Sequence, residues 1–305
     1  MTSTVLSNQH IVYAMSPDNQ PALRVEDGDI VEIHTCDCFE GQIESADQDF
    51  GGIDWERINP ATGPIYVEGA EPGDLLVVHI QEIQLADRGV MTTGPNLGVL
   101  GDELERNSIR MIPVRDGKAI FSDALELPIQ PMIGVIGTAP AQGSVPCGTP
   151  GDHGGNMDCK RITEGARLIL PVNVPGALFS LGDVHAAMGD GEVAVCGIEI
   201  AAAVRVQLHL LKGKNWPVPM LVDDHHVITI ASEKFLDDAA TRAAKNMVHF
   251  LEQECGMDKA EATFLLSAAG DLRVCQVVDP LKTARFELPR WIAEKQGFSF
   301  SAIQV

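Results

Sequence analysis

Short apolar runs separated by glycine, proline, asparagine and aspartate fill most of this chain, and this spacing constrains its fold most. The sequence includes 29 glycines and 18 prolines, which form turns and interrupt helices. Residues 22–35 and 63–85 each alternate between apolar and polar side chains around a tight turn, and residues 119–140 continue the pattern. Such segments are typical of paired β-strands. We therefore expect a β-rich α+β protein whose body is a β-sandwich or barrel.

The C-terminal third has a different pattern. Residues 232–255 place apolar side chains at helical spacing, with Ser232 as the expected N-cap and Gly256 as the stop. A second helix is expected over residues 258–270, and a strand over residues 271–279. A helix–helix–strand block after a strand-rich region predicts a smaller, helix-containing α/β part.

The change of pattern divides the chain into two regions. With 305 residues, 45% of them hydrophobic, the chain is long enough for one large or two modest domains with a real core. We expect residues 1–215 to form the β-rich body that carries the site motifs. Residues 216–305 are expected to form an α+β region packed on that body.

Charge and cysteine usage narrow the class of protein. Lys and Arg total 22 against 43 Asp and Glu, a formal net charge of −21, which argues against nucleic acid or an anionic membrane surface as a partner. The seven cysteines are an odd, scattered set without zinc-ribbon spacing. The N-terminus resembles no signal peptide, and no segment has the length of a membrane span. We therefore expect a reduced, cytoplasmic protein with a small-molecule partner.

Residues 182–200 concentrate ionisable side chains in an apolar part of the sequence. Asp183, His185, Asp190, Glu192 and Glu199 lie here among glycines and small apolar residues. Burying so many charges is costly unless a metal ion, a proton or a hydrogen-bond partner compensates them. This segment is therefore the main candidate for a functional site.

The residues of this cluster also have purely structural interpretations. Asp190 lies between two glycines and fits a turn, and His185 alone fits a hydrogen-bonded interior histidine. Glu192 and Glu199 are an odd number of positions apart, so a regular strand directs them to opposite faces. Either a bulge at Gly197 brings them together, or only one of them faces the site.

Two other segments offer metal-binding side chains. Residues 150–162 place His153, Asn156 and Asp158 on a glycine-rich loop, and His and Asp are common ligands of divalent metals. A surface turn is the alternative interpretation of that loop. Asp37 follows a predicted strand and is close to a glycine, a position typical of site residues and equally of turn-capping aspartates.

Several of these segments together resemble the acetamidase/formamidase family. They are TCDCFEGQI at 35–43, HGGNMD at 153–158, GALFSLGDVHAAMGDGEV at 176–193 leading into CGIE, and the tail DLRVCQVVDPLKTARFELP at 271–289. The resemblance implies a hydrolase that cleaves the carbon–nitrogen bond of small linear amides such as formamide or acetamide, giving a carboxylate and ammonia. It also implies a β-rich fold and a homo-oligomer, dimeric or higher.

The candidate residues agree with this chemistry. Amide hydrolysis needs a nucleophile, a polarised carbonyl and a proton for the departing amine, and a bound metal supplies the first two. We expect a divalent metal, Zn²⁺ first, with Ca²⁺ or Mg²⁺ as alternatives if the ligands are mostly oxygens. The candidate ligands are Asp37, His153, Asp158 and His185.

The remaining candidates have supporting or proton-transfer roles. Glu192 is the expected general base, and Glu199 is the second choice. Asp183 is expected to orient His185 from behind, and Asn156 to support the ligands by hydrogen bonding.

Two other interpretations stay open at this point. A non-catalytic metal- or small-molecule-binding protein of the same fold would bind metal without releasing ammonia from any short amide. A cysteine-dependent amidase would use Cys159 or Cys196, each of which is close in sequence to candidate site residues.

Overall fold

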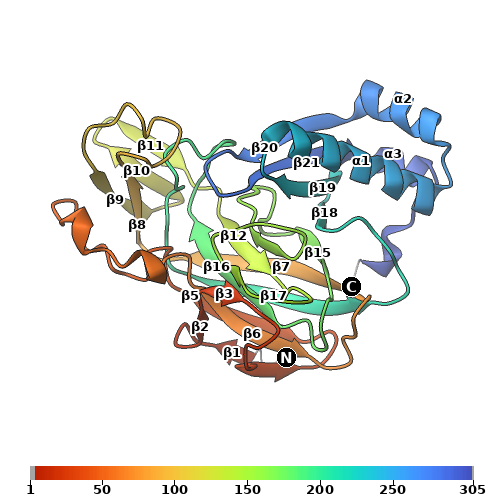
Figure 1. The fold of residues 1–305 in the computed structure, drawn as a ribbon, viewed down its shortest axis with the longest axis horizontal. Helices are drawn as coiled ribbons and strands as arrows, with labels where there is room; N and C mark the ends of the chain where they lie inside the picture. The colour runs from red at the N-terminus through yellow and green to blue at the C-terminus, as the bar shows by residue number, and fades with distance from the viewer. Residues whose placement is uncertain (1–3, 304–305) are drawn as a thin grey trace.

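The computed structural model describes residues 4–303 of the chain, and strands form most of its ordered structure (Figure 1). A nine-stranded sheet has the spatial order β1 (Thr4–Leu6), β5 (Ile30–Thr35), β17 (Ala202–Leu211), β7 (Leu75–Leu85), β15 (Arg167–Pro171), β18 (Met220–Val222), β19 (His226–Glu233), β21 (Lys282–Pro289) and β20 (Asp271–Gln276). A second sheet has the order β14 (Gly154–Asn156), β12 (Met132–Gly137), β16 (Phe179–His185), β6 (Ala61–Val67) and β2 (Ile11–Val12), with β4 (Leu23–Val25) also paired to β6. The expected β-rich α+β class is confirmed.

Smaller elements complete the fold. A four-stranded sheet has the order β11 (Leu125–Pro128), β10 (Lys118–Ser122), β9 (Ser108–Arg115) and β8 (Arg88–Thr93), and β13 (Val145–Pro146) pairs with β3 (Ala14–Met15). The helices are α1 (Leu236–Cys255), α2 (Lys259–Ala269) and α3 (Arg290–Lys295), with short 3-10 turns η1 (Phe50–Gly52), η2 (Trp55–Arg57) and η3 (Phe300–Ala302). In Figure 1 the three α-helices gather beside strands β18–β21, away from the N-terminal strands.

Two hydrophobic cores lie on opposite faces of the nine-stranded sheet. Successive side chains of a strand point to opposite faces, and in β7 Leu76 and Val78 belong to the core that the second sheet closes. Leu75 and Val77 belong instead to the core that α1 covers through side chains such as Phe250. The body is therefore a β-sandwich, and the helices cover the outer face of its larger sheet.

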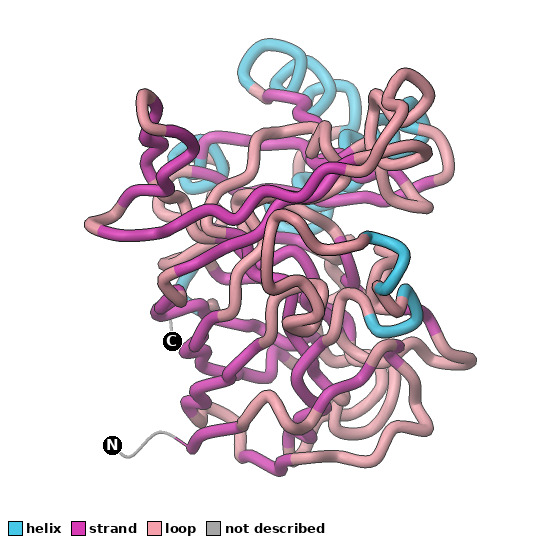
Figure 2. Tube along the Cα trace, turned by 90° about the vertical axis from the view of Figure 1, so that its left-hand side faces the viewer, coloured by secondary structure: helices cyan, strands magenta, loops and turns pink. Residues whose placement is uncertain are grey.

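The C-terminal region shares this sheet with the body. Strand β15 of the body pairs antiparallel with β18, and β19, β21 and β20 extend the same sheet. The tube view in Figure 2 shows strands through most of the molecule, with most of the helical segments in its upper part. The expected boundary at residues 215 and 216 therefore falls within a continuous sheet.

Both predicted helices form, but the first does not begin at the expected N-cap. Helix α1 ends at Gly256, which adopts a left-handed conformation (φ 64°), and Asp258 caps α2 by accepting a hydrogen bond from the N–H of Ala260 at 2.8 Å. Ser232 is not the N-cap of α1, because it belongs to β19 and its hydroxyl hydrogen-bonds Thr283 at 3.0 Å. Among residues 4–303, no helix combines the length and apolar character needed to cross a bilayer.

Candidate functional site

Strand β16 carries two ionisable side chains into the interior. It is the middle strand of the second sheet and is buried along its whole length, with Asp183 and His185 two positions apart. On the neighbouring strand β12, a Cβ at Gly134 would lie 2.5 Å from a carboxylate oxygen of Asp158 and 2.5 Å from one of Asp183. Only glycine leaves room for these two carboxylates to meet.

Glu192 and Glu199 come from an irregular segment after β16. Residues 186–201 form no continuous strand, and isolated bridges, including one between His185 and Glu199, hold them. The odd spacing of the glutamates does not separate them, because alternation applies only to a regular strand. Both glutamates line the same pocket. Gly197 lets this segment pass close to His185, because a Cβ at position 197 would lie 2.7 Å from Nδ1 of that histidine.

His185 is surrounded by three carboxylates. Its Nε2 lies 3.1 Å from Oε1 of Glu199, 3.5 Å from Oδ1 of Asp183 and 3.8 Å from Oδ1 of Asp158. Among the described residues, both ring nitrogens of His185, both carboxylate oxygens of Asp158 and Oε2 of Glu199 are buried without a hydrogen-bond partner. Buried polar atoms are rarely left unpaired, so this concentration indicates a site for a ligand that joins them.

Burial and crowding shift the pKa values of these groups. Burial lowers the pKa of His185, but the carboxylates of Glu199 and Asp183 outweigh it and place that pKa well above its ordinary value. Burial raises the pKa of Asp158 well above its usual range, and Asp279 adds to the shift. Burial also raises the pKa of Glu199 to about 8. Without a cation the cluster therefore holds protons at neutral pH, and a cation that binds there displaces them and leaves the carboxylates ionised.

The side chains fit a divalent cation. Two groups of three have ligand atoms within 4.8 Å of one another: Asp158, His185 and Glu192 in the first, and Cys38, Asp183 and Glu199 in the second. Carboxylate oxygens and an imidazole nitrogen are ordinary ligands of Zn²⁺. The unpaired atoms, the glycine that makes room for two carboxylates and the type of donor all agree with cation binding.

Asp37 belongs to neither group of clustered ligands. Its Oδ1 accepts hydrogen bonds from the backbone N–H of Phe39 at 2.9 Å and of Gly41 at 3.0 Å, and the residue lines a separate, smaller pocket. The structure therefore gives Asp37 the turn-capping role that was the alternative interpretation of this position.

His153 also lies apart from the other candidate ligands. It belongs to neither group of clustered ligands and is not among the residues that line the main pocket. Gly154 and Gly155, both at positive φ (99° and 78°), turn the chain between His153 and Asn156. Burial lowers the pKa of His153 to about 4, so its imidazole is neutral at pH 7. Two of the four expected ligands, Asp158 and His185, are brought together.

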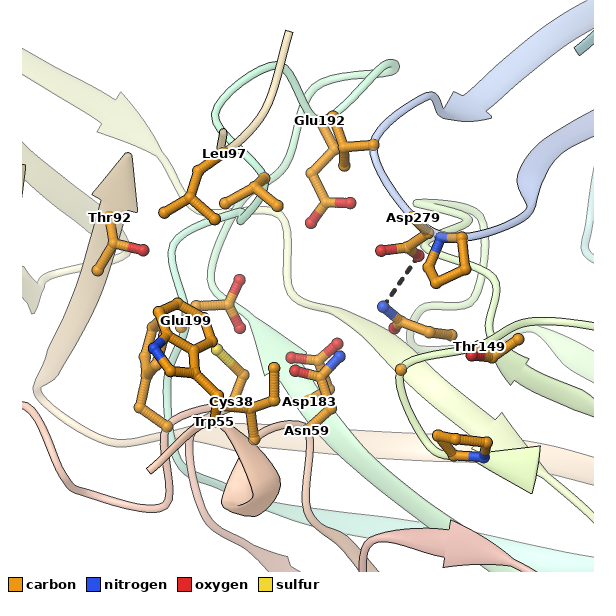
Figure 3. A pocket seen from close by; sticks show the side chains of 18 of the residues that line it. Cys38, Trp55, Asn59, Thr92, Leu97, Thr149, Asp183, Glu192, Glu199 and Asp279 are labelled. Atoms are coloured by element: carbon orange, nitrogen blue, oxygen red, sulfur yellow. Dashed lines mark hydrogen bonds between the residues drawn. The ribbon is translucent and has the colours of Figure 1, made fainter. Parts of the chain in front are cut away.

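Asp279 is a site residue that the sequence analysis did not identify. It lies in the loop between β20 and β21, where its Oδ2 accepts a hydrogen bond from Nδ2 of Asn156 at 3.0 Å (Figure 3). Burial raises the pKa of Asp279 well above its usual range, and Glu192 adds to the shift. The available signal was a carboxylate at the end of a predicted strand, directly before Pro280.

One pocket of about 740 Å³ gives access to the cluster. Figure 3 shows the carboxylates of Asp183, Glu192, Glu199 and Asp279 around a common space. Asp158 and His185 are 0% exposed and do not line this pocket, so they lie beneath the carboxylates. A small molecule that enters the pocket would lie next to these acidic groups.

The turn at Asp190 also carries an ion pair. The two carboxylate oxygens of Asp190 accept hydrogen bonds from Nη1 and Nη2 of Arg285 at 2.8 and 2.9 Å, and Nζ of Lys160 lies 3.1 Å away. Arg285 is 2% exposed and lies on β21, where it also pairs with Glu287 at 2.7 Å. The sequence analysis gave Asp190 only a turn role. The ion pair joins the segment that carries Glu192 to the C-terminal region.

We expect Asp190→Asn to lower the free energy of unfolding by about 1–3 kcal/mol, because the hydrogen bonds to Arg285 lose a charged partner. Urea denaturation measures the change. The control is Asp271→Asn, since the Asp271–Arg273 pair at 3.2 Å has side chains that are 66% and 52% exposed; this variant should lose less than about 1 kcal/mol. Equal losses in the two variants would contradict a structural role for the Asp190 pair.

The cysteines do not provide an activated nucleophile. Sγ of Cys196 accepts a hydrogen bond from the N–H of Thr92 at 3.1 Å and donates to its carbonyl at 3.2 Å, and burial raises the pKa of Cys196 to about 12. Burial raises the pKa of Cys159, but hydrogen bonding with Cys275 acts in the opposite direction and the net pKa is lowered. Cys159 is nevertheless 0% exposed, so it has no access to a substrate. Cys38 lines the pocket, and burial raises its pKa well above the usual range. A reactive thiol needs both a low pKa and access.

A pocket that opens onto clustered groups with shifted pKa values is typical of an enzyme. A profile of the Acetamidase/Formamidase family matches residues 3–145 and 144–294. The chain belongs to this family, as the sequence resemblance implied.

Relatives and solved structures agree with this assignment. The chain is 30% identical over 258 residues to a formamidase of Methylophilus methylotrophus and 28% identical over 263 residues to an acetamidase of Mycolicibacterium smegmatis. The matches cover 64% and 65% of this chain but only 63% and 65% of those relatives, less than two thirds of their length. The crystal structure of a Bacillus halodurans acetamidase is 48% identical with a TM-score of 0.95, covering 96% of this chain and 99% of that one. A predicted acetamidase/formamidase of Thermoanaerobacter tengcongensis is 47% identical with a TM-score of 0.96, covering 98% and 99%.

Proposed function

We propose that this protein is a metal-dependent amidase that hydrolyses the carbon–nitrogen bond of an amide to a carboxylate and ammonia. The observation that carries the proposal is the buried group of Asp158, His185 and Glu192, whose ligand atoms lie within 4.8 Å of one another at a pocket that Glu192 lines. Membership of the Acetamidase/Formamidase family supports the reaction type.

These three residues are the proposed cation ligands, and the imidazole among them favours Zn²⁺, because Ca²⁺ and Mg²⁺ are bound by oxygen ligands. A divalent cation held there would act as a Lewis acid that polarises a carbonyl and makes water more acidic. The sequence analysis expected Asp183 behind the imidazole. Its Oδ1 instead lies 3.5 Å from Nε2, the ring nitrogen that Asp158 also faces, so we place Asp183 beside the cation site. This assignment uses Glu192 as a ligand, whereas the sequence analysis favoured it as the general base.

Glu199 is the proposed general base. The N–H of Gly197 donates a hydrogen bond to its Oε1 at 2.8 Å, while its Oε2 has no partner among the described residues. A carboxylate with one fixed oxygen and one free oxygen beside the pocket is positioned to accept a proton from water. The water oxygen bonds to the amide carbon, Glu199 passes the proton to the nitrogen, and the carbon–nitrogen bond breaks to release ammonia.

Asp279 is proposed to bind the amide nitrogen. Its carboxylate faces the same space as Glu192 and Glu199 (Figure 3), and Asn156 fixes one of its oxygens at 3.0 Å. The carboxylate accepts hydrogen bonds from the NH₂ group and so orients the amide.

Cation content and ammonia release measured on the same preparation test the proposal. We expect about one tightly bound divalent cation per chain by elemental analysis, and loss of ammonia release from formamide and acetamide after chelation. Adding back the cation should restore turnover. Unchanged turnover by the chelated, metal-free protein would overturn the metal mechanism. Bound metal without ammonia from any amide would instead favour a binding protein.

A further inference from the structure

The pocket is much larger than the amide group it has to hold. Its volume is about 740 Å³, within the range of roughly 300–1,000 Å³ that is typical of sites for drug-sized ligands. Acetamide corresponds to about four water molecules, or on the order of 120 Å³ at ~30 Å³ each. Most of the pocket therefore lies beyond the reach of a formyl or acetyl group bound at the carboxylates.

Apolar side chains contribute much of the pocket lining on the side of Glu199 (Figure 3). In Figure 3, Trp55 and Leu97 lie on the side of the pocket opposite Asp279. Apolar side chains from four separate segments contribute to the lining: Phe39, Trp55, Ile58, Leu97, Val195 and Val278. Trp55 is 44% exposed and Leu97 is half-buried, so a ligand in this space would remove apolar area from water.

The charge of the lining excludes one kind of substrate. The acidic side chains that line the pocket are Glu56, Asp183, Glu192, Glu199 and Asp279. Among the described residues, no lysine, arginine or histidine is part of the lining. An acyl group that carries its own carboxylate would find no cationic side chain in the lining and would be repelled by the acidic ones.

The wall that carries Trp55 is held in place by its own hydrogen bonds. Trp55 begins η2, and the N–H of Asp54 donates to Oε1 of Gln42 at 2.8 Å. At the end of η2, the guanidinium of Arg57 donates to both oxygens of Glu40 at 2.6 and 2.9 Å. A wall whose backbone is fixed in this way loses little conformational entropy when a ligand packs on it.

We propose that the substrates of this site are amides with an uncharged apolar acyl group larger than methyl, such as an aryl or longer alkyl group, which packs against Trp55 and Leu97. The inference rests on the proposed amidase function. The amide is bound at the carboxylates, and the apolar group extends along the wall formed by residues 39–58 and 97. One well-placed apolar group changes kcat/KM by about 10- to 200-fold.

Three amides and two tryptophan variants test this inference on the metal-loaded protein. We expect kcat/KM for phenylacetamide to exceed that for acetamide by about 10- to 200-fold, and kcat/KM for the anionic amide succinamate to stay at or below that for acetamide. Trp55→Ala should reduce the advantage of phenylacetamide by about tenfold or more, with cation content unchanged. Trp291→Ala is the matched control, because Trp291 is 63% exposed on α3 and outside the pocket lining; it should keep the full preference.

The outcomes separate this inference from the proposed function. Equal kcat/KM for acetamide and phenylacetamide, or a preference for succinamate, would overturn the inference while ammonia release still supported an amidase. A preference for phenylacetamide that Trp55→Ala does not reduce would overturn the role of the apolar wall. Ammonia release from none of the amides would overturn the proposed function itself.

Discussion

Replacing His185 by asparagine is expected to remove most of the bound cation and to lower kcat/KM by more than about 100-fold. Mutations of groups that only support a ligand typically cost about 10- to 100-fold in metal affinity or activity, and His185 is proposed as a ligand itself. Its Nε2 is also the atom from which three carboxylates lie between 3.1 and 3.8 Å. Elemental analysis and ammonia release measure the two effects.

His153→Asn is the matched control for this variant. His153 is also buried, at 6% exposed, but it lies outside both groups of clustered ligands. The His153 variant should therefore keep its cation content. Circular dichroism and thermal unfolding of both variants identify any loss of folding. A folded His185 variant with full cation content and normal turnover would rule out His185 as a ligand.

Replacing Glu199 by glutamine is expected to lower kcat by about 10²- to 10⁴-fold, the usual contribution of a general acid–base group, while the cation stays bound. The amide oxygen of glutamine still accepts the hydrogen bond that the N–H of Gly197 donates at 2.8 Å, so the loop should keep its conformation. A glutamine side chain, however, does not take a proton from water. Steady-state kinetics and elemental analysis of the same sample test the prediction.

Glu192→Gln separates the roles of the two glutamates. Its carboxylate belongs to the group with Asp158 and His185, so we expect this variant to lose cation as well as activity. The opposite pattern, in which Glu192→Gln keeps its cation and Glu199→Gln loses it, would exchange the two roles. The general base would then be Glu192, the first choice from the sequence.

Local features of the sequence predicted the secondary structure well. The helices over residues 236–255 and 259–269 form where apolar side chains repeat at helical spacing, and Gly256 ends the first of them. Ser232 is the exception, because β19 continues to Glu233 by pairing with β21. A strand pairing between distant residues overrides a local capping preference, and nothing within residues 230–236 reveals that pairing.

The sequence identified the site less completely than the secondary structure, because contacts between distant residues also assemble the site. Asp183 and His185 lie two positions apart on one strand, so their proximity follows from the sequence. Asp279 is more than 120 residues from its partner Asn156, and only the folded chain places them together. Asp37 illustrates a second difficulty, because a carboxylate after a strand fits a site and a turn cap equally well.

The sequence by itself determined the strand-rich class, the helical C-terminal segments and the costly concentration of charge at residues 182–200. Tertiary structure decided which charges share a site, since Asp158, Asp279 and the segment that carries Glu192 and Glu199 are far apart in the sequence. It also decided that Arg285 compensates Asp190, and that glycines at 134 and 197 leave room for the carboxylates and the imidazole. The physical reason is that the cost of burying a charge depends on its neighbours in space, which long-range strand pairing selects.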